Sequence, residues 1–333
     1  MSDMTYRPLG DSGLMVSTVG LGTNAFGTRI DARQTQSVVD AALDEGVTLF
    51  DTSDTYGLGA SEELLGRSLG RRRDDVVLAT KFGMDMQGAN GPDWGARASR
   101  RYVRRAVEAS LRRLGIDHID LYQLHQPDLV TPIEETLHAL SELVVEGKVR
   151  YLGCSNFAAW EVVDAHWAAT TAGVQPFVSA QNEYSLYNRA AEEELVPALQ
   201  RTGMSLVAYF PLAYGLLTGK YRRGERAPEG SRLSADSQAH RLAGADWDRV
   251  EALHGFAEQR GIGILDVAIG GLAAQPTVGS VIAGATRPEQ VQANVHAGLW
   301  QPAEDDLVAL AEVNAERAAG MTHRSFTRDV RLP

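Results

Sequence analysis

The chain contains a single cysteine, Cys154, among its 333 residues. One thiol excludes an intramolecular disulfide, a CxxC redox pair and a zinc site built from paired cysteines. The eight histidines are scattered without the spacing of metal ligands, so we predict no metal. The first ten residues lack the apolar stretch of a signal peptide, and the expected location is therefore cytoplasmic.

Long apolar runs and an excess of positive charge are missing as well. The longest charge-free stretch, residues 267–286, is interrupted by Gln275, Pro276 and several glycines, which is not typical of a membrane span. The 32 Lys and Arg residues are outnumbered by 43 Asp and Glu residues, and the formal net charge is −11. Such a balance argues against a nucleic-acid-binding protein. An anionic ligand would need a local cluster of cations or backbone N–H groups.

Short apolar segments recur along the chain, and most of them are followed by a segment with helical periodicity. With a hydrophobic content of 44%, the chain can bury a large core. Eight such units favour a closed (β/α)8 TIM barrel over an open sheet. No linker divides the sequence, so we predict a single domain of residues 1–333, which begins with a β-hairpin over residues 6–18. The predicted strands are Val19–Gly22, Val47–Phe50, Val76–Thr80, Ile119–Leu124, Val149–Cys154, Val178–Gln181, Ser205–Tyr209 and Val278–Ile282.

Two helices carry clear signals at their N-termini. Asp31 and Gln34 have the spacing of a capping box, in which each side chain bonds to the other residue's backbone N–H. Thr131 and Glu134 have the same spacing, with Pro132 at the predicted first helical position. Both patterns predict a helix that begins directly after the capping residue.

The longest irregular segments are residues 84–98 and 222–246, each of which follows a predicted strand. In a barrel these are the positions of loops that shape the substrate site. The basic run at residues 71–73 is interpreted as a solvated helix end.

Polar side chains follow the carboxyl ends of the predicted strands, where a barrel carries its active site. Asp51 and Lys81 end consecutive strands, so a carboxylate and an ammonium would meet where water is limited. The pair is either a structural salt bridge or, with Tyr56, a proton-transfer group, because a nearby ammonium lowers the pKa of a phenol. His125 follows the fourth strand. It is either a structural histidine or a neutral imidazole that bonds a substrate oxygen.

Six segments resemble the signature stretches of the aldo-keto reductase superfamily in order and spacing: FDTSDTYG, TKFG, LHQPD, GCSNF, QNEYSL and PLAYGLLTGKY. The resemblance covers about residues 6 to 296 and is closest to bacterial oxidoreductases related to potassium-channel β subunits. It implies reduction of a small carbonyl substrate with NADPH rather than NADH. Tyr56 would be the general acid, Lys81 would lower its pKa, Asp51 would hold Lys81, and His125 would orient the carbonyl.

The resemblance also implies how a dinucleotide would be held, because no GxGxxG motif opens a helix after a strand. Members of the superfamily hold the cofactor through residues after several strands. Phe210 stands where many relatives have Ser, and Ala283 where they often have Pro. The corresponding residues here are Ser155, Asn156, Gln181 and Tyr209 for the nicotinamide, Leu212, Gly215, Leu217 and Lys220 for the pyrophosphate, and Gly284, Thr286, Gln290 and Asn294, with Arg287, for the adenosine phosphate.

Other interpretations remain open at this point. Ser155 and Asn156 could instead cap a helix that begins at Ala158. Strand alternation places Cys154 on the face opposite Ser155, which favours an inert core thiol. The whole chain could be a regulatory subunit that senses its cofactor, as the channel β subunits do. A lyase that uses Lys81 as a Schiff-base lysine is disfavoured, because Asp51 would keep Lys81 protonated. The residues define no oligomeric state.

Overall fold

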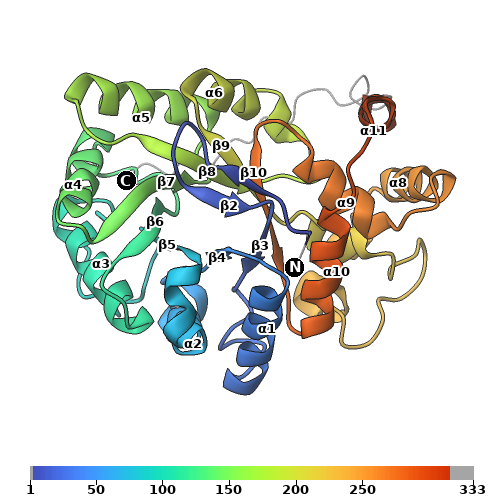
Figure 1. Cartoon of the computed structure of the whole chain (residues 1–333), viewed down its shortest axis with the longest axis horizontal. Coiled ribbons are helices and arrows are strands. Elements are labelled where there is room, and N and C mark those ends of the chain that lie inside the picture. Colours follow the sequence, from blue (N-terminus) through green and yellow to red (C-terminus); the bar gives the residue numbers. More distant parts are fainter. Residues whose placement is uncertain (1–2, 316–333) are drawn as a thin grey trace.

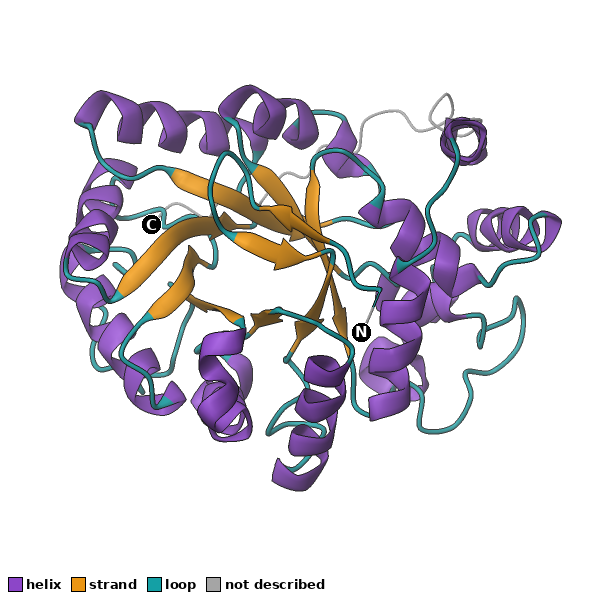
Figure 2. Cartoon of the chain, viewed as in Figure 1, coloured by secondary structure: helices purple, strands orange, loops and turns teal. Residues whose placement is uncertain are grey.

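The computed structural model describes residues 3–315, and in this range eight parallel strands close into a barrel (Figure 1). Helices surround the barrel on its outer side (Figure 2). Strand β10 closes the ring because it pairs with both β3 and β9. The predicted (β/α)8 TIM barrel is confirmed. Its strands are β3 (Val19–Gly22), β4 (Leu49–Asp51), β5 (Val77–Phe82), β6 (Ile119–Leu124), β7 (Val149–Ser155), β8 (Phe177–Glu183), β9 (Ser205–Tyr209) and β10 (Val278–Gly284).

An N-terminal hairpin covers the end of the barrel where the strands begin. Its strands, β1 (Tyr6–Pro8) and β2 (Met15–Ser17), pair in antiparallel fashion. Leu9, Leu14 and Val16 pack against apolar residues of the barrel strands and fill this end. Gly10, at the turn, has a φ of +58°, and a Cβ there would lie 2.3 Å from the carbonyl oxygen of Val178. Only glycine therefore allows the turn to approach the barrel so closely.

The helices of the outer layer bury their apolar faces against the strands, as their periodicity predicts. Gly270 and Gly271 lie inside α9, and a Cβ at Gly270 would lie 2.7 Å from the carbonyl oxygen of Ala297 in α10. These glycines thus permit close helix packing. The helices that follow barrel strands are α1 (Ala32–Asp44), α2 (Ala60–Leu69), α3 (Arg100–Leu114), α4 (Ile133–Val145), α5 (Ala159–Ala172), α6 (Leu195–Thr202), α9 (Ile264–Ala273) and α10 (Pro288–Gly298), and the additional helices are α7 (Ala239–Ala243), α8 (Trp247–Gln259) and α11 (Glu304–Ala315).

The capping predictions have different outcomes. Asp31 and Gln34 form the predicted capping box at α1. The prediction for α4 is wrong: its N-cap is Pro132, without a side-chain capping bond, and the helix begins one residue later. The hydroxyl of Thr131 donates instead to Asp128 at 2.8 Å, because the preceding loop offers a carboxylate within reach.

The interpretation of residues 71–73 as a solvated helix end is wrong for Arg73. This side chain is only 11% exposed, and its Nη2 lies 2.7 Å from Oδ2 of Asp120 at the start of β6. The sequence separation of the two residues hides this pair from local pattern analysis. Arg73 therefore fixes the segment after α2 to the N-terminal end of the barrel.

Two kinds of feature are absent from the described residues. Within residues 3–315, no helix combines the length and apolar content needed to cross a membrane. In the same part of the chain, no group of three or more His, Cys, Asp or Glu side chains is arranged to hold a metal ion.

Candidate active site

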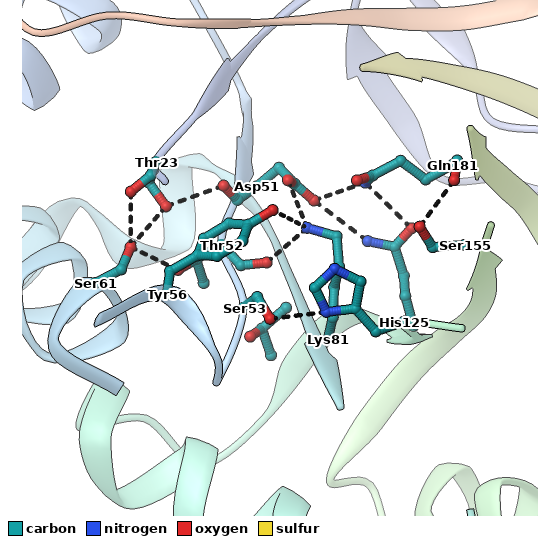
Figure 3. Close-up of polar contacts among 12 residues, drawn as sticks. Thr23, Asp51, Thr52, Ser53, Tyr56, Ser61, Lys81, His125, Ser155 and Gln181 are labelled. Atoms are coloured by element: carbon teal, nitrogen blue, oxygen red, sulfur yellow. Dashed lines mark hydrogen bonds and ion pairs between the residues drawn. The ribbon is translucent and has the colours of Figure 1, made fainter. Parts of the chain in front are cut away.

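Lys81 and Asp51 form a buried ion pair beneath the C-terminal end of the barrel. The Nζ of Lys81 lies 2.7 Å from Oδ2 of Asp51, and the side chain of Lys81 has no exposed surface. It also donates to the carbonyl oxygen of Thr52 at 2.9 Å and to the hydroxyl of Tyr56 at 3.3 Å (Figure 3). All the protons of the ammonium thus have acceptors, one of which is the phenol oxygen of Tyr56.

Asp51 and Lys81 lie close together because they are on adjacent parallel strands. Asp51 ends β4, and its backbone is in register with Ala79 of β5, two residues before Lys81. After Tyr56 the chain passes through left-handed conformations at Gly57, Leu58 and Gly59 before α2 begins. This turn holds Tyr56 over the ends of both strands.

Two amides hold the other oxygen of the Asp51 carboxylate. The Nε2 of Gln181 donates to Oδ1 at 2.8 Å, and the Nε2 of Gln123 donates to it at 3.3 Å. The carboxylate is therefore fixed from β6 and β8 as well as by Lys81. Because the carboxylate is fixed, the ammonium of Lys81 is held in one orientation, with a proton directed at the hydroxyl of Tyr56.

The charge of Lys81 lowers the pKa of Tyr56, as expected, but it is not the largest influence on this phenol. Burial raises the pKa of Tyr56 above its ordinary value, and this effect outweighs the opposing charge of Lys81. The pKa of Lys81 is itself raised: burial lowers it, but the charge of Asp51 and the hydrogen bonds more than compensate. In this structure, Tyr56 thus keeps its proton at neutral pH, as a proton donor must.

His125 lies beside Tyr56, with the two rings edge to face and their centres 6.1 Å apart. Burial, together with the charge of Lys81, lowers the pKa of His125 to about 3. The imidazole is therefore neutral at physiological pH. Its Nδ1 lies 3.1 Å from the hydroxyl oxygen of Ser53.

These groups line a cavity of about 1050 Å³ at the C-terminal end of the barrel. Lys81 lies behind its wall, whereas Asp51, Tyr56 and His125 contribute to the lining. Loop residues Met84 and Gln126 also line it on the side of His125. Three members of the predicted tetrad therefore lie at one surface, and the fourth, Lys81, contacts Tyr56 from behind it.

Most of the predicted cofactor-binding residues line the same cavity. Leu217 and Asn294 do not: both are buried and lie outside the lining. Those that line it are Ser155, Asn156, Gln181, Tyr209, Leu212, Gly215, Lys220, Gly284, Thr286, Arg287 and Gln290.

Ser155 and Asn156 are not helix caps. The N-cap of α5 is Ala158, whose N–H donates to the side chain of Glu161 at 2.8 Å. Asn156 has a φ of +60° and accepts a hydrogen bond from the hydroxyl of Tyr209 at 2.7 Å.

Cys154, on the opposite face, is fully buried, and burial raises its pKa, so its thiol is inert.

The cavity also contains cations that sequence analysis missed. Arg29 follows β3 and Arg232 lies in the long segment after β9, and the charge of Arg29 helps to lower the pKa of Arg232, although burial has the larger effect. Lys220 and Arg287 were predicted from the resemblance, whereas the position of Arg29 after a strand end is the signal that could have identified it. Among the described residues, none of these four side chains forms an ion pair with a carboxylate.

A closed barrel with a Tyr, Lys, Asp and His cluster at its C-terminal end defines a class of barrel oxidoreductases. The chain belongs to the aldo/keto reductase family, whose family model matches residues 18–315. It is 37% identical over 304 residues to a probable voltage-gated potassium channel subunit beta of Arabidopsis thaliana, with 88% of this chain and 91% of the relative covered. It is also similar to an uncharacterized oxidoreductase of Bacillus subtilis, at 36% identity with 88% and 91% covered. The L-glyceraldehyde 3-phosphate reductase of Escherichia coli is 35% identical, with 88% and 87% covered.

Proposed function

We propose that this oxidoreductase reduces aldehydes or ketones to alcohols with NADPH, and that Tyr56 is the general acid. The observation that carries the proposal is the position of Tyr56, whose side chain lines the cavity while Lys81 contacts its hydroxyl from the buried side. A phenol held between an ammonium and a cavity can give its proton only to a group in that cavity.

The residues of the cavity fit a dinucleotide phosphate. Its volume of about 1050 Å³ is at the upper end of the range for ligand pockets. Arg29, Lys220, Arg232 and Arg287 supply positive charge without a carboxylate partner, although Glu229 also lies in the lining. In a chain of net charge −11, such a cluster favours an anionic ligand. We propose that Arg287 and Gln290, which are assigned to the adenosine phosphate, select NADPH over NADH, whereas Lys220 binds the pyrophosphate that both cofactors share.

When bound, the nicotinamide would supply the hydride, and the chain supplies the proton and the orientation. Tyr56 donates its proton to the carbonyl oxygen, and Lys81 stabilises the phenolate that remains. Asp51 keeps Lys81 charged and oriented. His125 orients the carbonyl oxygen by a hydrogen bond from Nε2. Ser155, Asn156, Gln181 and Tyr209 would hold the nicotinamide.

A second candidate, a cofactor-sensing subunit, is favoured only by the names of relatives such as the channel subunit beta of Arabidopsis thaliana. Kinetics separate the two candidates. An enzyme should release oxidised cofactor and turn over repeatedly, whereas a sensor should retain its cofactor.

The test combines fluorescence titration with NADPH and NADH and steady-state assays on a panel of aldehydes and ketones. We expect tighter binding of NADPH and many turnovers per active site with at least one aldehyde. A bound cofactor that is neither released nor oxidised by any carbonyl would overturn the proposal in favour of the sensor.

A further inference from the structure

A series of hydrogen bonds leads from His125 through Ser53 and Asp54 to Asn90 in the protein interior. The hydroxyl oxygen of Ser53 lies 3.1 Å from Nδ1 of His125 and 3.3 Å from Oδ1 of Asp54. The other carboxyl oxygen of Asp54 accepts from the Nδ2 of Asn90 at 3.2 Å. Ser53 and Asp54 have no exposed surface, and Asn90 is also buried. These hydrogen bonds therefore connect the imidazole to a carboxyl group that water does not reach.

The surroundings of Asp54 contain little positive charge. Arg113 from α3 faces it, but its Nε donates to Glu62 of α2 at 2.6 Å and its Nη1 to Asn90 at 2.9 Å. Burial and the charge of Glu62 raise the pKa of Asp54 to about 7, against the opposing effect of Arg113.

The other titratable groups that interact with Asp54 are the phenols of Tyr56, Tyr102 and Tyr122. Lys81 is the charged group that acts on His125.

The hydroxyl of Ser53 has one proton to donate and several neighbours that can accept it. It already accepts from the backbone N–H of Thr55 at 3.2 Å, and Thr55 Oγ1 lies 3.0 Å away. An ionised Asp54 takes the proton of Ser53, so His125 must then donate from Nδ1. A protonated Asp54 donates to Ser53, which is then free to donate to Nδ1 of His125. Among the described residues, Nε2 of His125 has no hydrogen-bond partner.

We propose that Ser53 and Asp54 are positioning residues that set the tautomer of His125, so that a proton on Asp54 places a donor N–H at Nε2. The inference deepens the proposed function and rests on it for the role of Nε2 toward a carbonyl oxygen. On deprotonation, the proton of Asp54 moves to Ser53, the hydroxyl proton of Ser53 moves to Nδ1, and one proton leaves Nε2 for the cavity. The neutral imidazole then presents an acceptor to the cavity, so the site favours carbonyl reduction below the titration of Asp54 and loses this donor above it.

NMR spectroscopy of the full chain labelled with ¹⁵N-histidine measures the tautomer directly. The His125 signals are assigned by their loss in His125→Asn. In the unmodified protein we expect the Nε2–H tautomer below about pH 7 and a growing Nδ1–H fraction above it, since neutral imidazole can adopt either form. In Asp54→Asn the amide oxygen still accepts from Nδ2 of Asn90, so the NH2 group faces Ser53 and donates to it. This variant should hold the Nε2–H tautomer across the whole range. Ser53→Ala should abolish the switch.

Two matched variants control for the substitutions themselves. Asp85→Asn changes a carboxyl in an exposed ion pair with Arg97, and Ser179→Ala removes a buried hydroxyl that has no partner in the described structure. Both should show the same switch as the unmodified protein. A tautomer that does not change with pH, or that changes equally in Ser53→Ala, would overturn the proposal. The first of these results would mean that Ser53 donates to Thr55 instead.

Activity gives the second readout. The kcat for an aldehyde should fall by up to about tenfold per pH unit above the titration of Asp54, and Asp54→Asn should remove this fall. If no carbonyl is reduced at all, the proposed function fails while the NMR result still decides the tautomer relay. If turnover occurs and the NMR switch is absent, only the relay fails.

Discussion

The two ends of the barrel each contain a buried carboxylate that pairs with a cation. At the N-terminal end, Asp120 accepts from Arg73, Arg150 and the backbone N–H of Leu78 at 2.7, 3.1 and 2.9 Å. At the C-terminal end, Asp51 holds Lys81, whose ammonium also contacts the hydroxyl of Tyr56.

The difference lies in what the cation touches besides the carboxylate. Arg73 also bonds backbone carbonyls, and the hairpin fills the adjacent barrel end. Lys81 touches a titratable phenol that lines a cavity. A buried ion pair is thus no sign of catalysis by itself, because the same pairing can serve structure alone. The third contact and the open cavity are the observations that support the proposed catalytic role of the C-terminal pair.

The largest effect is expected for Asp51→Asn. The variant leaves Lys81 buried without its counterion, which costs about 3–5 kcal/mol of unfolding free energy. Turnover should fall as well, because the orientation of the ammonium toward Tyr56 is lost. Urea denaturation and steady-state kinetics check the two effects. Normal turnover in a correctly folded variant would show that the pair is only structural.

Asp120→Asn removes the corresponding carboxylate at the other end. We expect a loss of about 1.5–3 kcal/mol of unfolding free energy, the usual contribution of a hydrogen bond to a charged group. The kcat of the folded protein should remain unchanged, since Asp120 is remote from the cavity. A change in kcat comparable to that of Asp51→Asn would contradict the expectation that only the ion pair at the C-terminal end affects turnover.

Arg287→Ala tests the cations that lack carboxylate partners. The variant should weaken NADPH binding by about tenfold or more, as expected for the loss of one charge-assisted hydrogen bond, and affect NADH much less. Stability should change little because no ion pair is broken. Arg150→Ala, which removes a cation at the N-terminal end, is the control and should bind both cofactors normally. Equal weakening of NADPH and NADH would contradict the selectivity role of Arg287.

The smallest effect is expected at a surface pair. Glu146, at the end of α4, accepts from Arg104 at 2.6 Å and Lys148 at 3.0 Å, and these bonds lower its pKa to about 2. A carboxyl with a lowered pKa stabilises the folded state above its ordinary pKa of 4.5 and loses this contribution as the pH falls toward 2. Because the pair is partly exposed, Glu146→Gln should cost less than about 1 kcal/mol at neutral pH and reduce the acid sensitivity slightly. Acid titrations of unfolding free energy measure this, and a loss as large as that of Asp120→Asn would contradict it.

The barrel was predictable because its signals are local. Each strand is a short apolar run and most are followed by helical periodicity, so every predicted barrel strand is present, with ends shifted by at most two residues. Asp51, Lys81 and His125 were found because parallel strands bring their carboxyl ends to one place. Tyr56 was found from its position shortly after a strand.

The remaining features depend on contacts between distant segments. Arg113 lies in the last turn of α3, where a cation suits the helix dipole, and nothing local indicates its bond to Glu62. Ser53 reads as one polar residue among several in FDTSDTYG, and its contact with His125 spans 72 positions. Arg232 lies in a segment without periodicity. Such contacts arise only after the barrel has closed.

The proposed reaction depends on Tyr56 to deliver the proton to the carbonyl oxygen. Single-turnover oxidation of bound NADPH by an aldehyde, measured in the unmodified protein and in Tyr56→Phe at saturating cofactor, tests it most directly. We expect the variant to bind NADPH normally and to react about 10²- to 10⁴-fold more slowly, the usual contribution of a general acid. An unchanged rate in Tyr56→Phe would show that Tyr56 is not the general acid.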